Sequence, residues 1–344
     1  MKTTIACLSL VALLFVLPVL LAHHRAAAQT RAAVPALASL ELTGPYVYQN
    51  LAIFAVHDRH AAQHDEILTL QEALAQKTVT IEEVGQVNQL VASNKGKHSV
   101  YLQAGDIVKG GQQDRVLQHD TVLPPNAKRV ALSAFCVEAG RWRARGHEPV
   151  RHFASSNATI MTKRQKMAVK VAGNQSAVWD SVAAAQAEMG GKVGGSVRAR
   201  ESATSLQLSL EDKKVTGSVE EYVKNLEKSL PKDNDVVGYA VAVNGSVEAV
   251  DVFASPKLFG KMKGKLLKAS ATEALAAKTD QPSEPPQVDA VRALMADAES
   301  GAARTEKETL RTQVTRKETR RNVVFETSDP MVPAKAVHKS YLAK

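Results

Sequence analysis

The first part of the chain after residue 45 alternates short apolar runs with turn residues. The segment 50–57 (NLAIFAVH) predicts a strand, and 68–75 (LTLQEALA) has the spacing of a short helix. Because the runs that follow are short and have no long helices between them, we expect them to form antiparallel sheets. These further runs are 79–84, 87–92, 99–102, 107–108 and 129–137.

The second part adds longer helical patterns. Residues 177–189 predict a helix that ends at Gly190-Gly191, and residues 219–230 predict a second helix, followed by Pro231. Two apolar runs, 236–243 and 247–253, flank Asn244-Gly245. This pair between apolar runs is the strongest short-range signal for a β-hairpin.

A third helix is predicted to start directly after this hairpin. Ser255 is a suitable N-cap and Pro256 suits the first helical position. Further on, 288–297 predicts a short helix, and the final strands are expected at 322–326 and 336–341.

Together these patterns predict an α+β fold of mainly antiparallel sheets with several packed helices, in one large domain. Its parts would be a signal peptide, a tether, the core, a linker with a charged mobile segment, and a C-terminal strand pair that packs on the core. The corresponding ranges are 1–28, 29–44, 45–277, 278–321 and 322–344.

The N-terminus predicts export. Lys2 precedes an apolar run from Ile5 to Ala22, and Ala26-Ala27-Ala28 offers a site for a signal peptidase. The alternative is a retained membrane anchor, because the run approaches the length that spans a bilayer. Pro18 and the small-residue site favour cleavage. We therefore expect a periplasmic or extracellular protein with no stable membrane span after processing.

Charge and cysteine content narrow the classes of partner. Cleavage would remove Lys2 and Arg25, so that the formal charge falls from +9 to +7, and would leave Cys136 as the single cysteine. No intrachain disulfide is then possible, and the fold must rest on its core. Only 4% of the residues are aromatic. Together with export, this argues against nucleic acid and favours a cationic surface that meets anionic lipids or glycans.

The segment 104–120 (AGDIVKGGQQDRVLQHD) is the densest in chemistry. Gly110-Gly111 allows a tight turn with accessible backbone N–H groups, and Lys109 and Arg115 flank it. Such a turn could cradle a phosphate or a carboxylate. The alternative is an ordinary hairpin turn whose charges face water.

A second segment, 135–142 (FCVEAGRW), contains a lone cysteine next to Glu138 and Arg141. The alternation along the preceding strand makes Cys136 an inward-facing packing residue rather than a nucleophile. Glu138 and Arg141 lie where this strand ends, so they would either contribute to a site or form an ion pair that holds the following loop.

No motif identifies a catalytic reaction or a cofactor. His57, His60 and His64 have a spacing that could serve a metal, but an exposed loop is the better interpretation. The glycines at 190–195 do not match the spacing of a phosphate-binding loop. We therefore predict neither a metal nor a cofactor.

On these two segments the chain resembles the bacterial ARG-and-rhodanese-phosphatase-superfamily-associated protein domain, a family of unknown function. The resemblance spans about residues 50–277, and its most specific parts are AGDIVKGGQQDR and FCVEAGRW. The family name refers to the genes found beside its members, which encode ADP-ribosylglycohydrolases and rhodanese-like phosphatases, and implies no catalytic residues. The patterned polar positions of the family fall here on Asp106, Lys109, Gly110, Gly111, Gln113, Asp114, Arg115, Glu138, Arg141 and Trp142.

Three hypotheses follow. The first is a binding or interaction module of the cell envelope that recognises a small anionic ligand, a glycan or an envelope protein at the turn 109–115 with Glu138 and Arg141. The second is a hydrolase for a phosphorylated, glycosyl or nucleotide-like substrate, with Asp106, Asp114 and Glu138 as acid, base or metal ligands. The third is a structural protein in which these motifs hold strands together.

Overall fold

Two almost wholly apolar strands, β2 (Leu51–His57) and β12 (Val236–Val243), pair inside an eight-stranded sheet. All residues of both strands are buried. In β2, Leu51 and Ile53 belong to one hydrophobic cluster, whereas Phe54 belongs to another on the opposite face. The run is continuously apolar because both faces of the sheet are covered.

The computed structural model describes residues 37–61, 67–146, 148, 151–159, 162–330 and 336–344. In the large sheet the strands follow the order β1-β2-β12-β13-β17-β16-β15-β14, and all neighbours are antiparallel. The remaining strands of this sheet are β1 (Glu41–Tyr48), β13 (Ser246–Phe253), β14 (Ala302–Thr309), β15 (Thr312–Glu318), β16 (Asn322–Ser328) and β17 (Ala336–Ala343).

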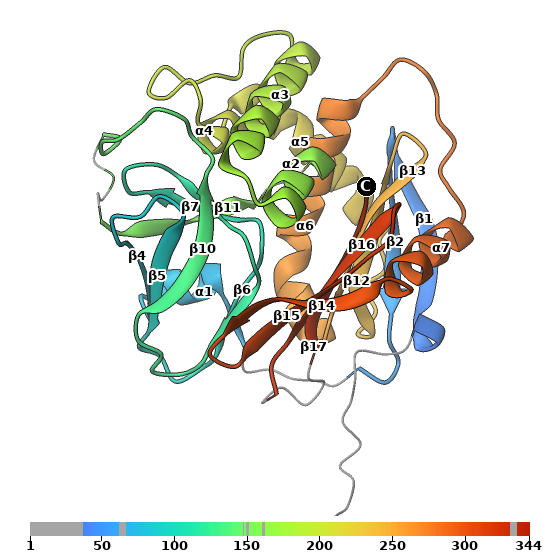
Figure 1. Cartoon of the computed structure of the whole chain (residues 1–344). Coiled ribbons are helices and arrows are strands. Elements are labelled where there is room, and N and C mark those ends of the chain that lie inside the picture. Colours follow the sequence, from blue (N-terminus) through green and yellow to red (C-terminus); the bar gives the residue numbers. More distant parts are fainter. Residues whose placement is uncertain (1–36, 62–66, 147, 149–150, 160–161, 331–335) are drawn as a thin grey trace, which may run out of the picture. The chain divides into compact units, whose positions relative to one another are not determined.

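Helices pack on both faces of this sheet (Figure 1). On one face α6 (Pro256–Ala277) packs against β12, and α3 (Gln175–Val193) and α5 (Lys213–Glu227) pack against α6. On the other face α7 (Val288–Glu299) contacts β16 and β13. Each helix therefore covers apolar side chains that the strands present to its own side of the sheet.

A second, six-stranded sheet has the order β11-β7-β8-β10-β5-β4. Its edges approach each other through a bridge between Glu82 and His152, so the sheet nearly closes on itself. A hydrophobic cluster, which includes Ile81 and Leu102, is separate from the clusters of the large sheet. The strands are β4 (Val79–Glu83), β5 (Gln89–Asn94), β7 (Asp106–Gly110), β8 (Arg115–Leu117), β10 (Val130–Cys136) and β11 (Phe153–Thr159).

Short elements complete the described part of the chain. A three-stranded sheet has the order β3-β6-β9, and its β3–β6 pair is parallel. The short helix α2 continues directly into the π-helix η2. These elements are η1 (Leu37–Ser39), β3 (Leu68–Thr69), α1 (Leu70–Ala75), β6 (Val100–Leu102), β9 (Thr121–Leu123), α2 (Lys163–Lys166), η2 (Met167–Ala172) and α4 (Leu206–Leu210).

The fold is α+β with mainly antiparallel sheets, as the sequence predicted. Local signals account for several element ends. Asn244 and Gly245 take φ values of +48° and +81° in the two-residue turn between β12 and β13. Ser255 caps α6 by accepting a hydrogen bond from the Leu258 N–H at 3.1 Å. The predicted hairpin and this predicted helix start are therefore confirmed.

Other predictions of local structure are wrong. Residues 301–321 form the hairpin β14–β15 instead of a mobile segment, because β15 pairs with β16 and is anchored in the large sheet. The tether predicted for 29–44 ends too late, since β1 begins at Glu41. Helix α3 continues through Gly190-Gly191 and ends at Val193, and the following Gly194 takes the left-handed conformation at φ +68°.

The described residues, from Leu37 onward, belong to one compact unit. Residues 278–287, predicted as a linker, form neither helix nor strand, and the C-terminal pair β16–β17 joins the large sheet beside β13. The predicted signal peptide, 1–28, lies outside the described residues. Among the helices that are described, none has the length and apolar character needed to cross a bilayer.

Candidate functional site

The turn between β7 and β8 surrounds the side-chain carboxylate of one of its own residues, Asp114. Gly110 and Gly111 take φ values of +118° and +57°, and the Gly110 N–H donates a hydrogen bond to Asp114 Oδ1 at 2.9 Å. A Cβ on Gly111 would lie 2.6 Å from both Glu83 and Phe153. The glycine pair therefore supplies the backbone conformation that a tight turn requires. The anion that this turn binds is the Asp114 side chain.

Two buried carboxylates and two arginines form what we call the arginine–carboxylate cluster: Asp114, Glu138, Arg141 and Arg145. Arg145 binds Asp114 through two nitrogens, at 2.9 and 3.1 Å. Arg141 Nε donates to Glu138 at 2.7 Å, and the Asp114 N–H donates to the same side chain at 3.1 Å. The side chains of both acids are fully buried. The two motif segments thus meet in space, as the binding hypothesis requires.

The electrostatics of this cluster favour charged side chains. Burial opposes the charge of Glu138, but hydrogen bonds from Arg141 and Ser202 outweigh it and lower the pKa of this carboxyl group. For Arg145, burial is again outweighed, here by its hydrogen bonds to Asp114, and the pKa rises above its ordinary value. A carboxyl group with a lowered pKa is a poor proton donor near neutral pH, so Glu138 is not suited to general acid catalysis.

The other predicted residues of segment 104–120 point to different partners. Lys109 pairs with Glu211 at 2.7 Å, and Gln113 donates to the Glu138 carbonyl at 2.8 Å. Arg115 is 1% exposed and donates to the Gln113 carbonyl at 2.9 Å. Lys109 and Arg115 therefore hold internal contacts and do not flank an open anion cradle as expected.

Asp106 does not join the arginine–carboxylate cluster. It forms an ion pair with Lys265 of α6, and the backbone N–H of Gln103 donates to it at 3.3 Å. Burial, only partly offset by Lys265, raises the pKa of Asp106. The hydrolase hypothesis required all three of its carboxylates in one pocket, and the structure places only Asp114 and Glu138 together.

An open groove lies beside the cluster, along residues 139–143 and 201–204, with a volume of about 510 Å³. Arg141 lines it, so the groove shares a residue with the buried cluster. Trp142 is 55% exposed, and Arg143 is also exposed. Thr204 ties the two sides together, because its hydroxyl donates to the Ala139 carbonyl at 2.7 Å and accepts from the Ala139 N–H at 3.1 Å.

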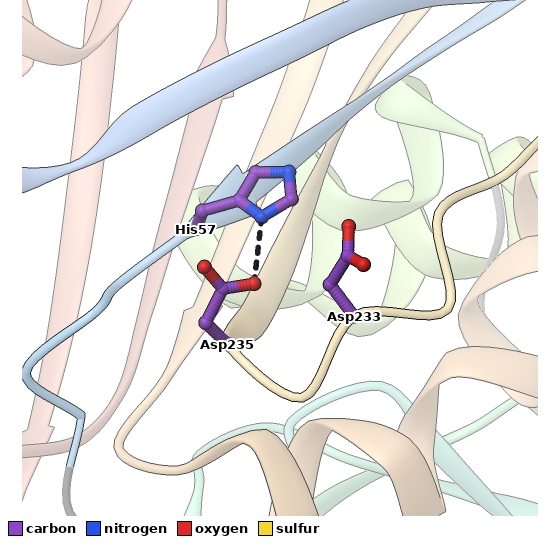
Figure 2. Close-up of side chains that lie close together, drawn as sticks. All are labelled: His57, Asp233 and Asp235. Atoms are coloured by element: carbon purple, nitrogen blue, oxygen red, sulfur yellow. Dashed lines mark hydrogen bonds and ion pairs between the residues drawn. The ribbon is translucent and has the colours of Figure 1, made fainter.

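The sequence favoured an exposed loop for His57, His60 and His64. His60 is exposed and His64 lies outside the described residues, but His57 is buried at the end of β2, so the prediction is wrong for His57. His57 at the end of β2 contacts Asp235 through Nδ1 at 2.9 Å, and Asp233 lies close by in the segment before β12 (Figure 2). The ligand atoms of the three residues are within 4.8 Å of one another. His57 Nε2 also contacts the Thr43 hydroxyl at 2.9 Å. Both ring nitrogens thus have protein partners, which explains the trio as a link between β1, β2 and β12.

Sequence reasoning missed a second buried polar centre, which we call the His338 cluster: His338, Asp120, Asp251, Tyr101 and Thr327. His338 contacts Asp120 at 2.8 Å and Asp251 at 3.1 Å, and Tyr101 and Thr327 donate to Asp120 at 3.0 and 2.8 Å. Burial opposes protonation of His338, but the two carboxylates raise its pKa to about 9. These residues come from distant parts of the chain and follow no sequence motif, so only the pairing of strands reveals them.

Cys136 is a packing residue, as its position in the strand predicted. Its thiol is free and buried at the end of β10. Burial raises the pKa of this thiol to about 11. Since thiolates rather than thiols are nucleophilic, Cys136 is unreactive at neutral pH.

The fold and these sites define an α+β protein with two buried polar clusters and one open groove at the edge of one of them. The chain belongs to the family of the ARG and Rhodanese-Phosphatase-superfamily-associated Protein domain, whose model matches residues 39–342. This match extends beyond both ends of the resemblance at 50–277 and includes β14, β15, β16 and nearly all of β17. No curated protein and no solved structure shows a significant match to the chain.

Proposed function

We propose that this protein is an exported, non-enzymatic binding module of the cell envelope, and that its ligand lies in the groove at residues 139–143 and 201–204. The observation that carries the proposal is the exposed Trp142 beside Arg143 in an open groove. Large aromatic side chains are usually buried unless they contact a partner, and an exposed guanidinium pairs readily with carboxylate or phosphate oxygens.

The buried cluster gives this groove a rigid base. Arg141 donates to Glu138 and also to the carbonyls of Gly111 and Arg143. These hydrogen bonds fix the backbone next to Trp142. A binding residue held by buried hydrogen bonds loses little conformational entropy when a ligand arrives. Of the predicted residues, Trp142 then contacts the ligand together with the neighbouring Arg143, and the buried residues of both motifs act as support.

The lining of the groove points to an acidic sugar as the ligand class. Trp142 offers a flat apolar face for a sugar ring, and Arg143 offers a cation for its acid group. Glu201 also lines the groove and could accept hydrogen bonds from hydroxyl groups, while it would repel a second acid group. A glycan that carries one carboxylate or phosphate and several hydroxyl groups satisfies all three residues.

Fluorescence tests this directly. The chain has two tryptophans, so Trp179→Phe leaves Trp142 as the only indole. In this background we expect uronic acids or sugar phosphates to change the emission of Trp142, and neutral sugars to do so far less. Arg143→Ala should abolish the response and Glu201→Gln should strengthen it. If the protein is folded and none of these compounds changes its emission at millimolar concentration, the proposal is wrong.

Export is part of the proposal and has its own test. Expression of the full chain in a bacterium, followed by fractionation and intact mass measurement, should give a protein that lacks residues 1–28. A protein that keeps these residues and sediments with membranes would instead support the retained anchor.

The hydrolase is the second candidate, and the contact between Asp114 and Glu138 favours it. The lowered pKa of Glu138 and the guanidinium partners of both acids argue against acid–base roles. Purified protein should therefore leave phosphate ester and glycoside substrates intact. Turnover that disappears in Glu138→Gln, while the variant stays folded, would reverse this ranking.

A further inference from the structure

A small cavity lies apart from the groove, between the π-helix η2, α6 and the large sheet. Its volume is about 30 Å³. A buried water needs about 10–15 Å³ on this measure, so the cavity has room for about two waters or a molecule of similar size. Lys166, Leu266 and Ala269 line it and are themselves partly exposed. Gln103, Lys170 and Asp251 also line it.

Lys170 is the unusual member of this lining. It is 7% exposed, and its ammonium lies 4.8 Å from the centre of the Phe325 ring. Within the described part of the chain it forms no ion pair of 4.0 Å or less. The wider turn of η2, closed by the Gly173 N–H on the Ala168 carbonyl at 3.0 Å, places Lys170 at the cavity. Such π-helical turns are rare and occur often at functional sites.

The charges around Lys170 suit an amine that can lose its proton. Burial is the largest influence and lowers the pKa of Lys170, and the nearby Lys166 acts in the same direction. Asp120 and Asp251 oppose this only in part. A desolvated lysine next to a second cation is a recognised form of amine nucleophile.

The cavity also contains an unsatisfied acceptor. Gln103 is 5% exposed, and its Oε1 atom has no hydrogen-bond partner. Across the cavity, Asp251 adds a carboxylate that His338 already contacts at 3.1 Å. Because Lys166 and Lys170 share this lining with Asp251, charge does not select the compound, but the volume of about 30 Å³ admits only a few heavy atoms. A small carbonyl compound meets this limit and reacts with an amine, and the hydroxyl group of the carbinolamine that it forms can donate to the unsatisfied oxygen of Gln103.

We propose that Lys170 captures small aldehydes as an imine in this cavity. The ammonium group first gives one proton to solvent. The nitrogen lone pair then attacks the carbonyl carbon and forms the C–N bond of a carbinolamine, while one proton moves from the nitrogen to the oxygen. A second proton comes from solvent, the C–O bond breaks and the oxygen leaves as water. The product is a protonated imine, in which the nitrogen keeps its remaining hydrogen, so it carries the same charge above Phe325 as the ammonium did and the charge balance with Asp120 and Asp251 is preserved. This inference is independent of the groove and its ligand.

Reductive trapping tests the proposal. The full protein is treated with a limiting amount of acetaldehyde and cyanoborohydride at neutral pH, and the ethylated peptides are quantified by mass spectrometry. Lys170 should be labelled several-fold faster than the exposed Lys263. In urea this preference should vanish, because it depends on the fold. Labelling of Lys170 no faster than that of Lys263 in the native protein would overturn the proposal.

Two further measurements test whether the cavity causes the preferential labelling of Lys170. Ala269→Phe fills the cavity and leaves Lys170 itself unchanged. Labelling of Lys170 should therefore be suppressed in this variant, while Lys263 reacts as before. Benzaldehyde, which is too large for the cavity, should show no preference for Lys170 in the unaltered protein. Undiminished labelling of Lys170 in folded Ala269→Phe would mean that the cavity is not the route, and would equally refute the inference.

Discussion

The protein should unfold more readily at alkaline pH, because deprotonation of His338 removes a stabilising charge. Its folded pKa of about 9 lies above its ordinary value of 6.5, because Asp120 and Asp251 hold the proton on a ring that is 1% exposed. A group with a raised pKa contributes its full stability below pH 6.5 and loses it as the pH rises through about 9. At about 1.4 kcal/mol for each pKa unit, this difference corresponds to about 3 kcal/mol.

Urea unfolding between about pH 6 and pH 10 measures this contribution. The free energy of unfolding should fall by about 3 kcal/mol more in the wild type than in His338→Gln, which has no proton to lose. Comparison with the variant is essential, because Lys170 has a lowered pKa and its titration acts in the opposite sense. His152→Gln, at a histidine whose side chain is 59% exposed, is the matched control and should follow the wild type. Parallel pH profiles for the wild type and His338→Gln would refute the reasoning.

Three further predictions concern the first buried cluster and its surroundings. Arg145→Ala leaves a buried carboxylate without its two-nitrogen partner and should cost about 3–5 kcal/mol in urea unfolding, whereas Arg59→Ala, at a surface ion pair, should change stability by less than about 1 kcal/mol. Cys136 should react with a thiol reagent near neutral pH only as fast as the protein unfolds, and a rapid reaction with the native protein would contradict its burial. Gly111→Ala should lower the melting temperature more than Gly140→Ala, since both have positive φ but only Gly111 has neighbours within 4 Å of a new Cβ.

The sequence predicts the fold class because its strongest signals are local. The Asn244-Gly245 turn, the Ser255 cap and the apolar run of β2 each depend on neighbours within a few residues, and the structure confirms all three. The hairpin β14–β15 gives no comparable signal, because its strands are charged and β14 lies at the edge of the sheet. Polar strands of this kind are held by pairing with a strand that is itself anchored in the sheet, here β15 with β16, and the hydrophobic pattern of the polar strands does not reveal this pairing.

The candidate site is predictable to the same extent. Both motif segments indicate a turn and a strand end with unusual polar residues, and these segments do meet. The sequence does not show that Arg145 binds Asp114 through two nitrogens, since Arg145 lies outside both motifs and is brought there by the loop after β10. Nor does it reveal that Arg115 faces inward, because an arginine next to a glycine turn is ordinarily read as solvated.

The two roles proposed for the motif region can be separated because they use different residues. Trp142 and Arg143 are exposed, and in the proposed function they contact the ligand, so their replacement should remove binding and leave the free energy of unfolding almost unchanged. Arg145 is buried and holds the loop in place, so its replacement should lower stability. Because the loop is then no longer fixed, the same replacement should also weaken binding. If the cluster served only to hold strands together, Trp142→Ala and Arg143→Ala would change neither property. The comparison of these variants in both assays therefore distinguishes a supported binding groove from a structural ion-pair cluster.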